Sequence, residues 1–401
     1  MSSIQLYPEL WQTVFDRLDH EPRMKADLRN VSKTSRLFHA LVEPLLFGSI
    51  LLKSSFFGID AQTAALIRDL TSRIATRQWV KSIEIMIGDD DYQRIDIANI
   101  FVKLHNLREI AIYDSTLTDG MASHLLHLPR SFAFICVDAS CTTEAVNLAS
   151  DTRNLRMTAL TVDGLGGTNT IPLIKRLASG PHLSILHLNR DLFHHTALQN
   201  PNHHFDSLRH LQVYEPGTQT QVERFLSFLA SCPLLSHLTI TTRMHSGSFS
   251  LPSTSVPHLE SFDGSYSLAA LFVIGRPLAS LSVQWERGGN LWKKSLSKLV
   301  EGSVPLRGLS MVASKWYNDV LLDIAEYFPA LQSLKLYDSS RYSTNWMRER
   351  LASDIQGLLE LRILVITGDS PDDDLVLDHS ALKSPRSGNG HSSSVYYKRS
   401  M

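Results

Sequence analysis

Apolar residues recur along most of this chain in one short pattern, with an aliphatic or aromatic residue at positions 1, 4 and 6 of each segment. The segments are Val80/Ile83/Ile85, Leu107/Ile110/Ile112, Phe132/Ile135/Val137, Met157/Leu160/Val162, Leu183/Leu186/Leu188, Leu208/Leu211/Val213, Leu235/Leu238/Ile240, the incomplete Leu259/Phe262, Leu278/Leu281/Val283, Leu306/Leu309/Met311, Leu331/Leu334/Leu336 and Leu361/Leu364/Ile366. Seven consecutive steps from Val80 to Leu259 measure 27, 25, 25, 26, 25, 27 and 24 residues. A fixed period of this length predicts stacked repeats with one strand in each.

Helical patterns lie between the predicted strands. Two apolar stripes have the i, i+3, i+4 spacing of an amphipathic helix: Val222, Phe225, Leu226 and Leu229, and then Val320, Leu321, Ile324 and Phe328. Four prolines, Pro129, Pro181, Pro233 and Pro329, follow helical segments and should end them, because proline has no N–H and biases the preceding residue away from helical angles. Each repeat therefore consists of a helix, a turn and a strand.

One repeat of this kind does not fold alone, because fixing about 25 residues costs on the order of 25 to 50 kcal/mol of backbone entropy. Neighbouring repeats must cover its open faces. The pattern resembles the leucine-rich repeat, which implies an α/β fold: a right-handed solenoid (horseshoe) over residues 51–369, with parallel strands on the concave side and helices outside. Position 9 departs from the Asn or Cys that is usual in that family, as at Gly88, Ser115 and Asp191, so we expect irregular turns.

The concave face is the candidate surface for binding a target protein, because positions 3, 5 and 7 of each strand point away from the core. The residues predicted to line it are Tyr113, Asp138, Asp163, His187, Asn189, His210, Gln212, Tyr214, His237, Asp263, Gln284, Lys335 and Tyr337. A mixture of aromatic, histidine and carboxylate side chains suits protein recognition, since tyrosine supplies rigid contact area. For any one of these residues, the alternative is a solvated sheet face.

Residues 1–50 form a different module with three predicted helices. Pro8 suits the first turn of a helix whose apolar face is Leu10, Val14 and Leu18. The second helix is expected over Met24–Val31. Ser32 is then predicted to cap a third helix, with Leu37, Leu41 and Val42 on its apolar face, which Glu43-Pro44 should end. On pattern alone, these helices could also be a cap that covers the first repeat.

Particular residues in this module resemble the F-box, especially its fungal form: Leu6-Tyr7-Pro8-Glu9-Leu10, Val14-Phe15, Leu18, Leu28 to Lys33, and Leu37 to Phe47. The motif usually opens Leu-Pro-Pro-Glu, so Tyr7 is a departure. The resemblance implies that the module binds a Skp-type adaptor, and through it a cullin and a RING subunit, so that the chain would be the substrate receptor of an SCF-type E3 ubiquitin ligase. The positions that match the motif, shared between the module's core and the adaptor contact, are Leu6, Pro8, Glu9, Leu10, Val14, Phe15, Leu18, Val31, Ser32, Leu37 and Leu41.

The composition argues against several classes of protein. The 401 residues include 39 basic and 40 acidic side chains, so there is no basic excess of the kind that a nucleic-acid binder uses against phosphates. Three cysteines are too few for a disulfide framework, which favours a reducing compartment, the cytoplasm or the nucleus. No apolar run approaches the length of a membrane span, and we expect residues 370–401, rich in Asp, Ser and Gly, to be disordered.

Two segments are weak candidates for a nucleotide-binding loop and a zinc site. Gly164-Leu165-Gly166-Gly167 follows a strand, but Asn169 stands where a dinucleotide loop needs its third glycine. The 17 histidines, such as His194-His195 and His203-His204, lack the paired spacing of a zinc site. We therefore expect no catalytic residue, cofactor or metal. The alternatives to the ligase receptor are a repeat scaffold without a ligase role and an enzyme that uses the Gly164 loop.

Overall fold

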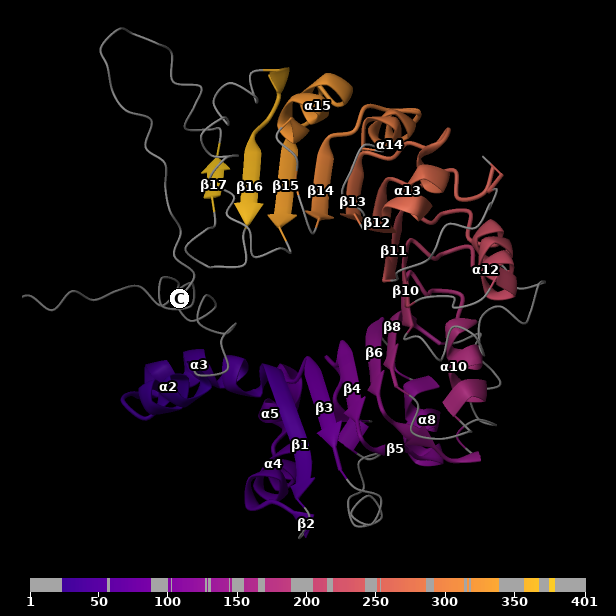
Figure 1. Cartoon of the computed structure of the whole chain (residues 1–401). Coiled ribbons are helices and arrows are strands. Elements are labelled where there is room, and N and C mark those ends of the chain that lie inside the picture. The colour runs from indigo at the N-terminus through magenta and orange to yellow at the C-terminus, as the bar shows by residue number, and fades with distance from the viewer. Residues whose placement is uncertain are drawn as a thin grey trace, which may run out of the picture. The chain divides into compact units, whose positions relative to one another are not determined.

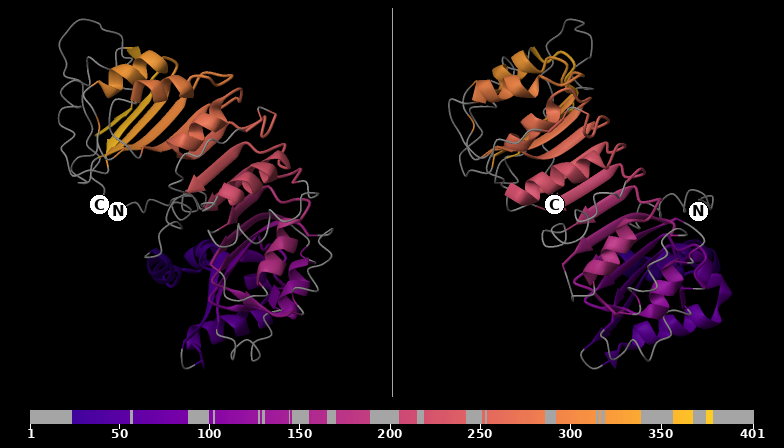
Figure 2. Two further views of the ribbon diagram at one scale, coloured as in Figure 1. Left: turned by 45° about the vertical axis from the view of Figure 1, so that its right-hand side comes forward. Right: turned by 90° about the vertical axis from the view of Figure 1, so that its right-hand side faces the viewer.

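The computed structural model describes most of the repeats and part of the N-terminal module. The described residues are 24–55, 58–87, 100–101, 103–126, 128, 131–143, 145, 155–164, 170–188, 205–214, 219–241, 251–252, 254–285, 292–313, 316, 319–338, 357–367 and 375–378. The chain divides into two compact units, Met1–Gln199 and Asn200–Met401. Figures 1 and 2 show that strands and helices alternate in both units, with the helices on one face of each sheet.

The first unit begins with a helical pair and continues as a sheet. Its described elements are α2 (Met24–Ser32), α3 (Arg36–Gly48), β1 (Ser49–Ser55), β2 (Gly58–Ile59), α4 (Ala61–Ser72), α5 (Ile74–Trp79), β3 (Ser82–Met86), β4 (Glu109–Tyr113), β5 (Thr116–Leu117), α8 (Asp119–Leu126), β6 (Phe132–Val137), β7 (Ser140–Cys141), β8 (Met157–Asp163), α10 (Thr170–Ala178) and β9 (Ile185–Leu188). The sheet has the order β2-β1-β3-β4-β6-β8-β9, and only the β1–β2 pair is antiparallel.

The second unit has the same construction. Its described elements are β10 (His210–Tyr214), α12 (Gln219–Ala230), β11 (His237–Thr241), β12 (Ser261–Ser265), α13 (Tyr266–Val273), β13 (Ser280–Trp285), α14 (Trp292–Leu299), β14 (Gly308–Ala313), α15 (Val320–Tyr327), β15 (Ser333–Asp338), β16 (Ile363–Thr367) and β17 (Leu375–Asp378). These strands lie in sequence order and are parallel, except that β17 is antiparallel to β16.

The core of each unit is built from positions 1, 4 and 6 of the repeats. Leu281 pairs with Leu309 and Val283 with Met311, and all four are almost fully buried. The predicted helical stripes also face the core. Every residue of the second stripe, Val320, Leu321, Ile324 and Phe328, is buried. In the first stripe, on α12, Phe225 and Leu229 are buried and Leu226 is half-buried, whereas the side chain of Val222 is outside the described part. An α/β stack with a mostly parallel sheet and a leucine-rich-repeat-like core is therefore confirmed within each unit.

The strand β6 corrects one predicted repeat. Phe134 pairs with Ile110 and Leu160 and is buried, whereas Ile135 lies on the opposite face. The predicted core set Phe132/Ile135/Val137 is therefore wrong after its first residue, because the register shifts between Phe132 and Ala133. A shift of one residue moves every following side chain to the other face. Phe134 and Cys136 fill the core instead.

Both ends of the predicted solenoid also differ from the expectation. The strand β1 starts at Ser49, and its buried Ile50 and Leu52 pair with Ile83 and Ile85, which adds a repeat that the sequence pattern did not reveal. Within the tail predicted to be disordered, Leu375–Asp378 forms β17 against β16, so that prediction is wrong for these residues. The remaining residues after 378 lie outside the described part.

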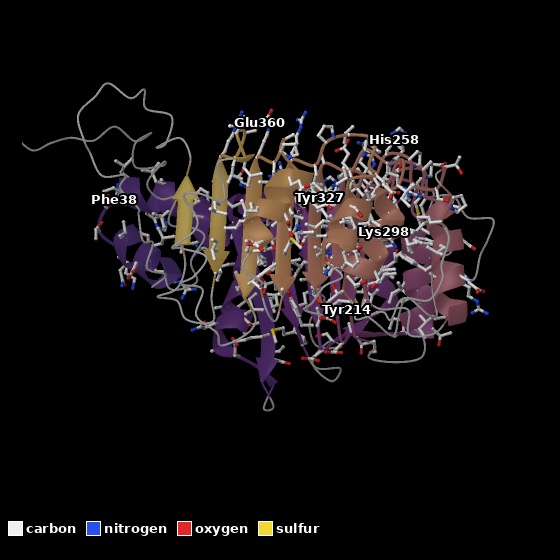
Figure 3. All side chains as sticks on the ribbon, turned by 45° about the horizontal axis from the view of Figure 1, so that its top comes forward. Phe38, Tyr214, His258, Lys298, Tyr327 and Glu360 are labelled. Carbon is white, nitrogen blue, oxygen red and sulfur yellow. The ribbon has the colours of Figure 1, made fainter. Side chains whose placement is uncertain are left out.

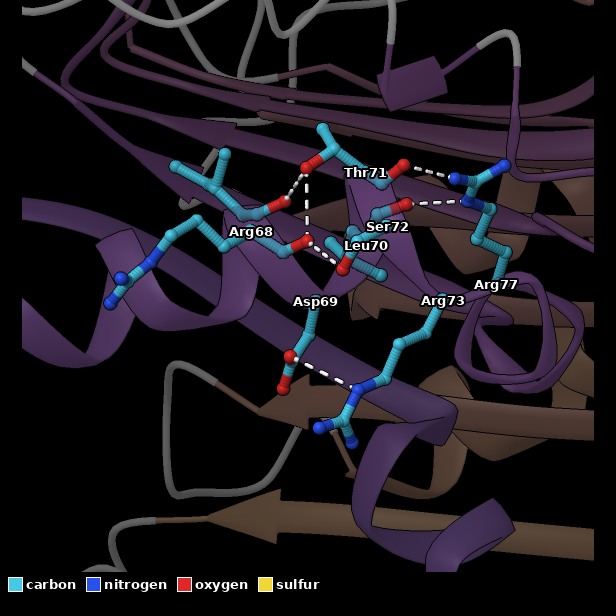
Figure 4. Close-up of polar contacts among 8 residues, drawn as sticks. Arg68, Asp69, Leu70, Thr71, Ser72, Arg73 and Arg77 are labelled. Carbon is cyan, nitrogen blue, oxygen red and sulfur yellow. Dashed lines mark hydrogen bonds and ion pairs between the residues drawn. The ribbon is translucent and has the colours of Figure 1, made fainter.

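The first repeats are joined by polar contacts that the turn sequences did not predict. Ser115, at the irregular position 9, is buried and accepts the N–H of Ile87 at 2.8 Å while it donates to the Tyr113 carbonyl at 2.6 Å. Its hydroxyl therefore links two successive turns, as a conventional Asn does by its side-chain amide. Figure 4 shows a second case, in which Arg77 of α5 donates to the carbonyls of Leu70 and Thr71 at the end of α4.

The strand β12 explains why one repeat lacks its third apolar residue. Position 6 is Gly264, and a Cβ there would lie 2.8 Å from Phe262 Cζ and 3.0 Å from the Ile240 carbonyl oxygen. The Phe262 ring occupies this space and stacks on Phe272 of α13, with ring centroids 5.0 Å apart. One large ring therefore fills two core positions.

A buried arginine closes the same repeat. Arg276 is 1% exposed and follows α13. Its guanidinium donates to four main-chain carbonyls within 3.1 Å: Nε to Ser255, Nη1 to Leu271 and Ile274, and Nη2 to Pro252. One side chain therefore joins the end of α13 to the segment before β12, and burial lowers its pKa from the ordinary value.

The three cysteines, Cys136, Cys141 and Cys232, are buried, as expected of small core residues. Burial raises the pKa of both Cys136 and Cys232 to about 12, so their thiols are protonated at pH 8 and are poor nucleophiles. We expect 5,5′-dithiobis(2-nitrobenzoate) at pH 8 to label the native protein slowly at these thiols and the guanidinium-unfolded chain at once. Labelling of the native protein at the unfolded rate would contradict their burial.

Candidate functional site

The helical pair α2–α3 has a very small core of its own. Leu28 and Val42 are its fully buried apolar residues in the described part of the pair. The residues packed around them are only partly buried: Val31, Phe38, Leu41, Leu45 and Leu46. Figure 3 labels Phe38 on α3. Leu37 is 49% exposed, so the pair presents apolar surface that these two helices do not cover.

Local chemistry fixes the ends of these helices differently from the sequence prediction. Ser35, not Ser32, caps α3, since its hydroxyl accepts the N–H of Phe38 at 3.1 Å. Ser32 is the last residue of α2, where its hydroxyl donates to the Arg29 carbonyl at 2.8 Å. The prediction that Glu43-Pro44 ends the third helix is also wrong, because α3 passes through Pro44 to Gly48.

The continuation of α3 joins the helical pair to the repeats. α3 ends at Gly48 and β1 begins at Ser49, so no linker separates the two elements. α3 also packs against α5 and β1, and the helical pair lies beside the first strands in Figure 1. A proline inside a helix costs about 3 kcal/mol or more. The packing of the half-buried Leu45 and Leu46 must offset that cost.

The predicted adaptor-contact residues that the structure describes differ in how exposed they are. Val31 and Leu41 pack on the small core of the pair, Ser32 makes its local hydrogen bond, and Leu37 is exposed. The other seven predictions, Leu6, Pro8, Glu9, Leu10, Val14, Phe15 and Leu18, lie outside the described residues. Among the four described positions, Leu37 is therefore the one available to a partner.

The open face of each unit is the sheet face that the helices leave uncovered. The predicted face residues that lie on it are Tyr113, Asp163 and His187 in the first unit, and His210, Gln212, Tyr214, His237, Asp263, Gln284, Lys335 and Tyr337 in the second. Tyr214 is 39% exposed at the end of β10 (Figure 3). Asp138 lies in the turn after β6 instead, with φ 48°, and Asn189 is outside the described residues. That these residues bind a target stays a prediction.

The open face of the first unit contains apolar side chains that the sequence pattern missed. Leu51 and Met86 are 40% and 41% exposed, and Ile135, Val137 and Ile185 are half-buried. Ile135 and Val137 were assigned to the core, and β1 was not assigned as a strand. Every residue of Phe132–Val137 is apolar, so a period-2 alternation fits this strand in either phase and gave no local signal that could place them.

Electrostatics on this face are dominated by carboxylates. Glu84 and Glu109 lie beside Tyr113, and burial together with these two charges raises the pKa of its phenol. His187 is half-buried, and desolvation lowers the pKa of its imidazole, which disfavours the charged form. The face therefore combines aliphatic surface with negative charge.

The open face of the second unit is more polar, with serine and threonine at many positions among larger side chains such as His210 and Lys335. Serines occupy neighbouring positions on four successive strands. Ser261 is paired with Ser280 and Ser282 with Ser310, and Gly308 lies between Ser280 and Ser333 and is paired with both. At one side of it, the rings of His210 and His237 stack with centroids 4.1 Å apart. Ser236 Oγ is 2.8 Å from Nδ1 of His237. These groups can make hydrogen bonds but offer little apolar contact area.

The Gly164 loop has a structural explanation. Gly164 has φ 78°, and a Cβ at this position would lie 1.8 Å from Oδ1 of Asp138. The glycine is therefore required by the neighbouring repeat turn, since both its left-handed backbone and the close carboxylate exclude a side chain. Asn169 and the histidines at 194, 195, 203 and 204 lie outside the described residues. Within the described residues, no group of three or more His, Cys, Asp or Glu side chains could hold a metal ion, and no helix is long and apolar enough to cross a bilayer.

Comparison with known proteins adds little beyond the architecture. No protein-family model matches the chain, and no curated protein matches it. Among solved structures, the chain is similar to the crystal structure of the TLR13–ssRNA13 complex, with a TM-score of 0.35 and 12% identity over 80% of this chain and 43% of that one. It is also similar to the Drosophila Toll–Spatzle complex, with a TM-score of 0.31 and 12% identity over 80% and 54%. The chain spans about half the length of the solved structures it matches.

Proposed function

We propose that this chain is the substrate-recognition subunit of an SCF-type E3 ubiquitin ligase. Its residues 1–50 would bind a Skp-type adaptor as an F-box, and its repeats would bind the target. The observation that carries the proposal is the apolar surface of α2–α3, where Leu37 is 49% exposed and, among the described side chains of the pair, Leu28 and Val42 alone are fully buried. Exposed apolar surface on a small helical module is typical of helix-in-groove recognition.

The mechanism of such a receptor is proximity. The repeats would hold a lysine of the target near the conjugating enzyme, which raises its effective concentration there. The direct connection of α3 to β1 supports this mechanism, because a module without a linker holds a fixed position on the first repeats. The groups that make and break bonds would belong to other subunits, so no catalytic residue is needed in this chain.

Replacement of Leu37 by aspartate tests the adaptor contact. The side chain is exposed, so we expect the fold to persist while the affinity for the adaptor falls by about tenfold or more, as for a central interface residue. The measurement is co-purification of the Skp-type adaptor with the full chain, followed by titration. Leu359→Asp is the matched control, because Leu359 is 79% exposed in the second unit. Equal adaptor binding by both variants would refute the assignment.

The alternative is a repeat scaffold without a ligase role, and one observation favours it. α3 packs against α5 and β1, as a cap on the first repeat would. A scaffold predicts that the full chain neither binds the adaptor nor loses any partner when Leu37 is changed. The co-purification experiment therefore separates the two functions directly.

A further inference from the structure

The open face of the first unit differs in chemistry from the equivalent face of the second. Its apolar side chains belong to four strands: Leu51 on β1, Met86 on β3, Ile135 and Val137 on β6, and Ile185 on β9. In the described strands of the second unit, serine and threonine are common at positions of the same kind, and the larger aliphatic side chains are fewer: Val312 on β14, and Ile363 and Val365 on β16. Both faces are built on the same repeat, so this difference is not required by the fold.

Pairing between strands places the apolar side chains next to charged ones, since Leu51 is paired with Glu84 and Met86 with Lys53. Ala111, which is buried, pairs with Ile135, and Ala133 pairs with Glu109, so small side chains separate the larger ones. Ala159 pairs with Ile185 at the other end. Adjacent parallel strands are about 4.8 Å apart, so Val137 lies beside Tyr113 on one strand and Asp163 on the other. Exposed apolar side chains that polar ones surround in this way mark an interaction site.

Acidic side chains adjoin this surface at the carboxyl ends of the strands. Asp114, Asp138 and Asp163 follow or end the successive strands β4, β6 and β8, and all three are exposed. Glu84 and Glu109 lie within the face itself. Lys53 is the cation of β1 on this side, and its Nζ is 4.0 Å from Asp60. Among the described residues, the other cations directly next to these strands, Lys81, Arg108 and Arg156, precede β3, β4 and β8 at the opposite end.

Two of the carboxylates are held on constrained backbone. Asp114 and Asp138 have φ 44° and 48°, in the left-handed region that aspartate tolerates better than most residues. The N–H of Asp114 donates to the Val137 carbonyl at 3.0 Å, and that of Asp138 donates to the Asp163 carbonyl at 2.7 Å. These bonds fix the carboxylates one strand apart. A partner would meet a row of charges that is already ordered, which reduces the entropic cost of binding.

We infer that the first-unit open face binds a basic amphipathic segment of a partner protein. Its apolar side chains would cover Leu51, Met86, Ile135 and Val137, and its Lys or Arg side chains would lie toward the carboxylates at the strand ends. Charge complementarity selects this occupant, because an acidic segment would meet Asp114, Asp138 and Asp163 with like charge. The inference rests on the proposed function only where it treats this segment as part of the ligase target.

Fluorescence anisotropy with the full chain tests the inference. The probes are three labelled 14-residue peptides that alternate Lys with Leu, Glu with Leu, or Lys with Ser. We expect the Lys/Leu peptide to bind about tenfold or more tighter than either of the others, with an affinity that falls as salt rises. Equal binding of the Glu/Leu peptide would overturn the charge argument, and equal binding of the Lys/Ser peptide would overturn the apolar one.

Variants locate the binding face. Asp138→Asn keeps a residue that tolerates the left-handed turn and should weaken the Lys/Leu peptide by about threefold, as expected for one exposed charge pair. Leu51→Ser combined with Met86→Ser should weaken it more strongly. The matched controls in the second unit, Asp206→Asn and Ile363→Ser, should leave it unchanged, since both residues are exposed and neither belongs to the predicted target-binding set. Loss of binding in the controls but not in the first-unit variants would overturn the assignment.

The failure of this inference and that of the proposed function have different signatures. Adaptor co-purification depends on α2–α3 and reports on the proposed function, whereas peptide binding reports on the open face. Sedimentation of the full chain provides a further check: a dimer that Leu51→Ser with Met86→Ser converts to a monomer would show that a second copy occupies the face, and would overturn the choice of a basic partner.

Discussion

Replacing Arg276 with methionine is expected to destabilise the second unit by at least about 3 kcal/mol, because four carbonyls within 3.1 Å of the guanidinium would lose it as a donor inside the protein, and of these Pro252 would keep the N–H of Ser255. The side chain is 1% exposed, so water does not replace it without opening the structure. Arg276→Lys should be intermediate, since an ammonium has three donors and lacks the planar fork. Chemical denaturation of the full chain, followed by circular dichroism, measures the loss.

The matched control is Arg362→Met, which makes the same substitution at an exposed position of the second unit. We expect its denaturation midpoint to stay within experimental error of the unmodified chain. Hydrogen exchange gives a second readout, because residues 254–260 and the end of α13 should lose protection together in Arg276→Met. Protection of both segments at the level of the unmodified chain would show that the guanidinium does not join them.

The second large effect is expected at Gly264. Alanine there would place a Cβ 2.8 Å from Phe262 Cζ and 3.0 Å from the Ile240 carbonyl oxygen, and the latter is main chain that does not rotate away. We expect Gly264→Ala to cost about 2 to 3 kcal/mol by overpacking. Phe262→Leu alone should cost about 1 to 3 kcal/mol, because it removes a ring stacked on Phe272 and leaves a cavity.

Combining the two substitutions provides the decisive comparison. Leucine at 262 makes room for the alanine Cβ, so Gly264→Ala with Phe262→Leu should be less destabilising than the sum of the single changes. Denaturation midpoints of the four chains measure the coupling. Strict additivity would mean that Phe262 and position 264 do not share one space, contrary to the packing of β12.

Much of the fold could be predicted from periodicity, because a leucine-rich core needs an apolar residue at the same position of every strand. Leu281 and Leu309 show this, as each is buried against the other. The prolines were equally informative: α8, α10, α12 and α15 end at Leu126, Ala178, Ala230 and Tyr327, two or three residues before their prolines.

The sequence was ambiguous where every residue of a strand is apolar. Phe132–Val137 contains no polar residue, so both faces fit the core pattern and local sequence does not choose between them. Pairing with β4 and β8 makes the choice, since Phe134 must align with Ile110 and Leu160. This is long-range information that a single strand does not contain.

The candidate sites were less predictable than the fold. Leu37 could not be separated from Leu41 by spacing, because both fit the apolar stripe of one helix and only packing shows which is exposed. The apolar face of the first unit was missed because Leu51 belongs to a strand outside the detected repeats. By contrast, the polar positions of the second unit followed correctly from strand alternation.

The strand β17 has a consequence for how a chain of this kind could change in length. It pairs antiparallel to β16 and covers that edge of the second unit from Ile363 to Ile366. A further repeat appended after β16 would have to displace it, because one edge accepts one neighbour. Duplication of an internal repeat leaves this final strand in place, so the array is expected to lengthen by copying its middle rather than its end.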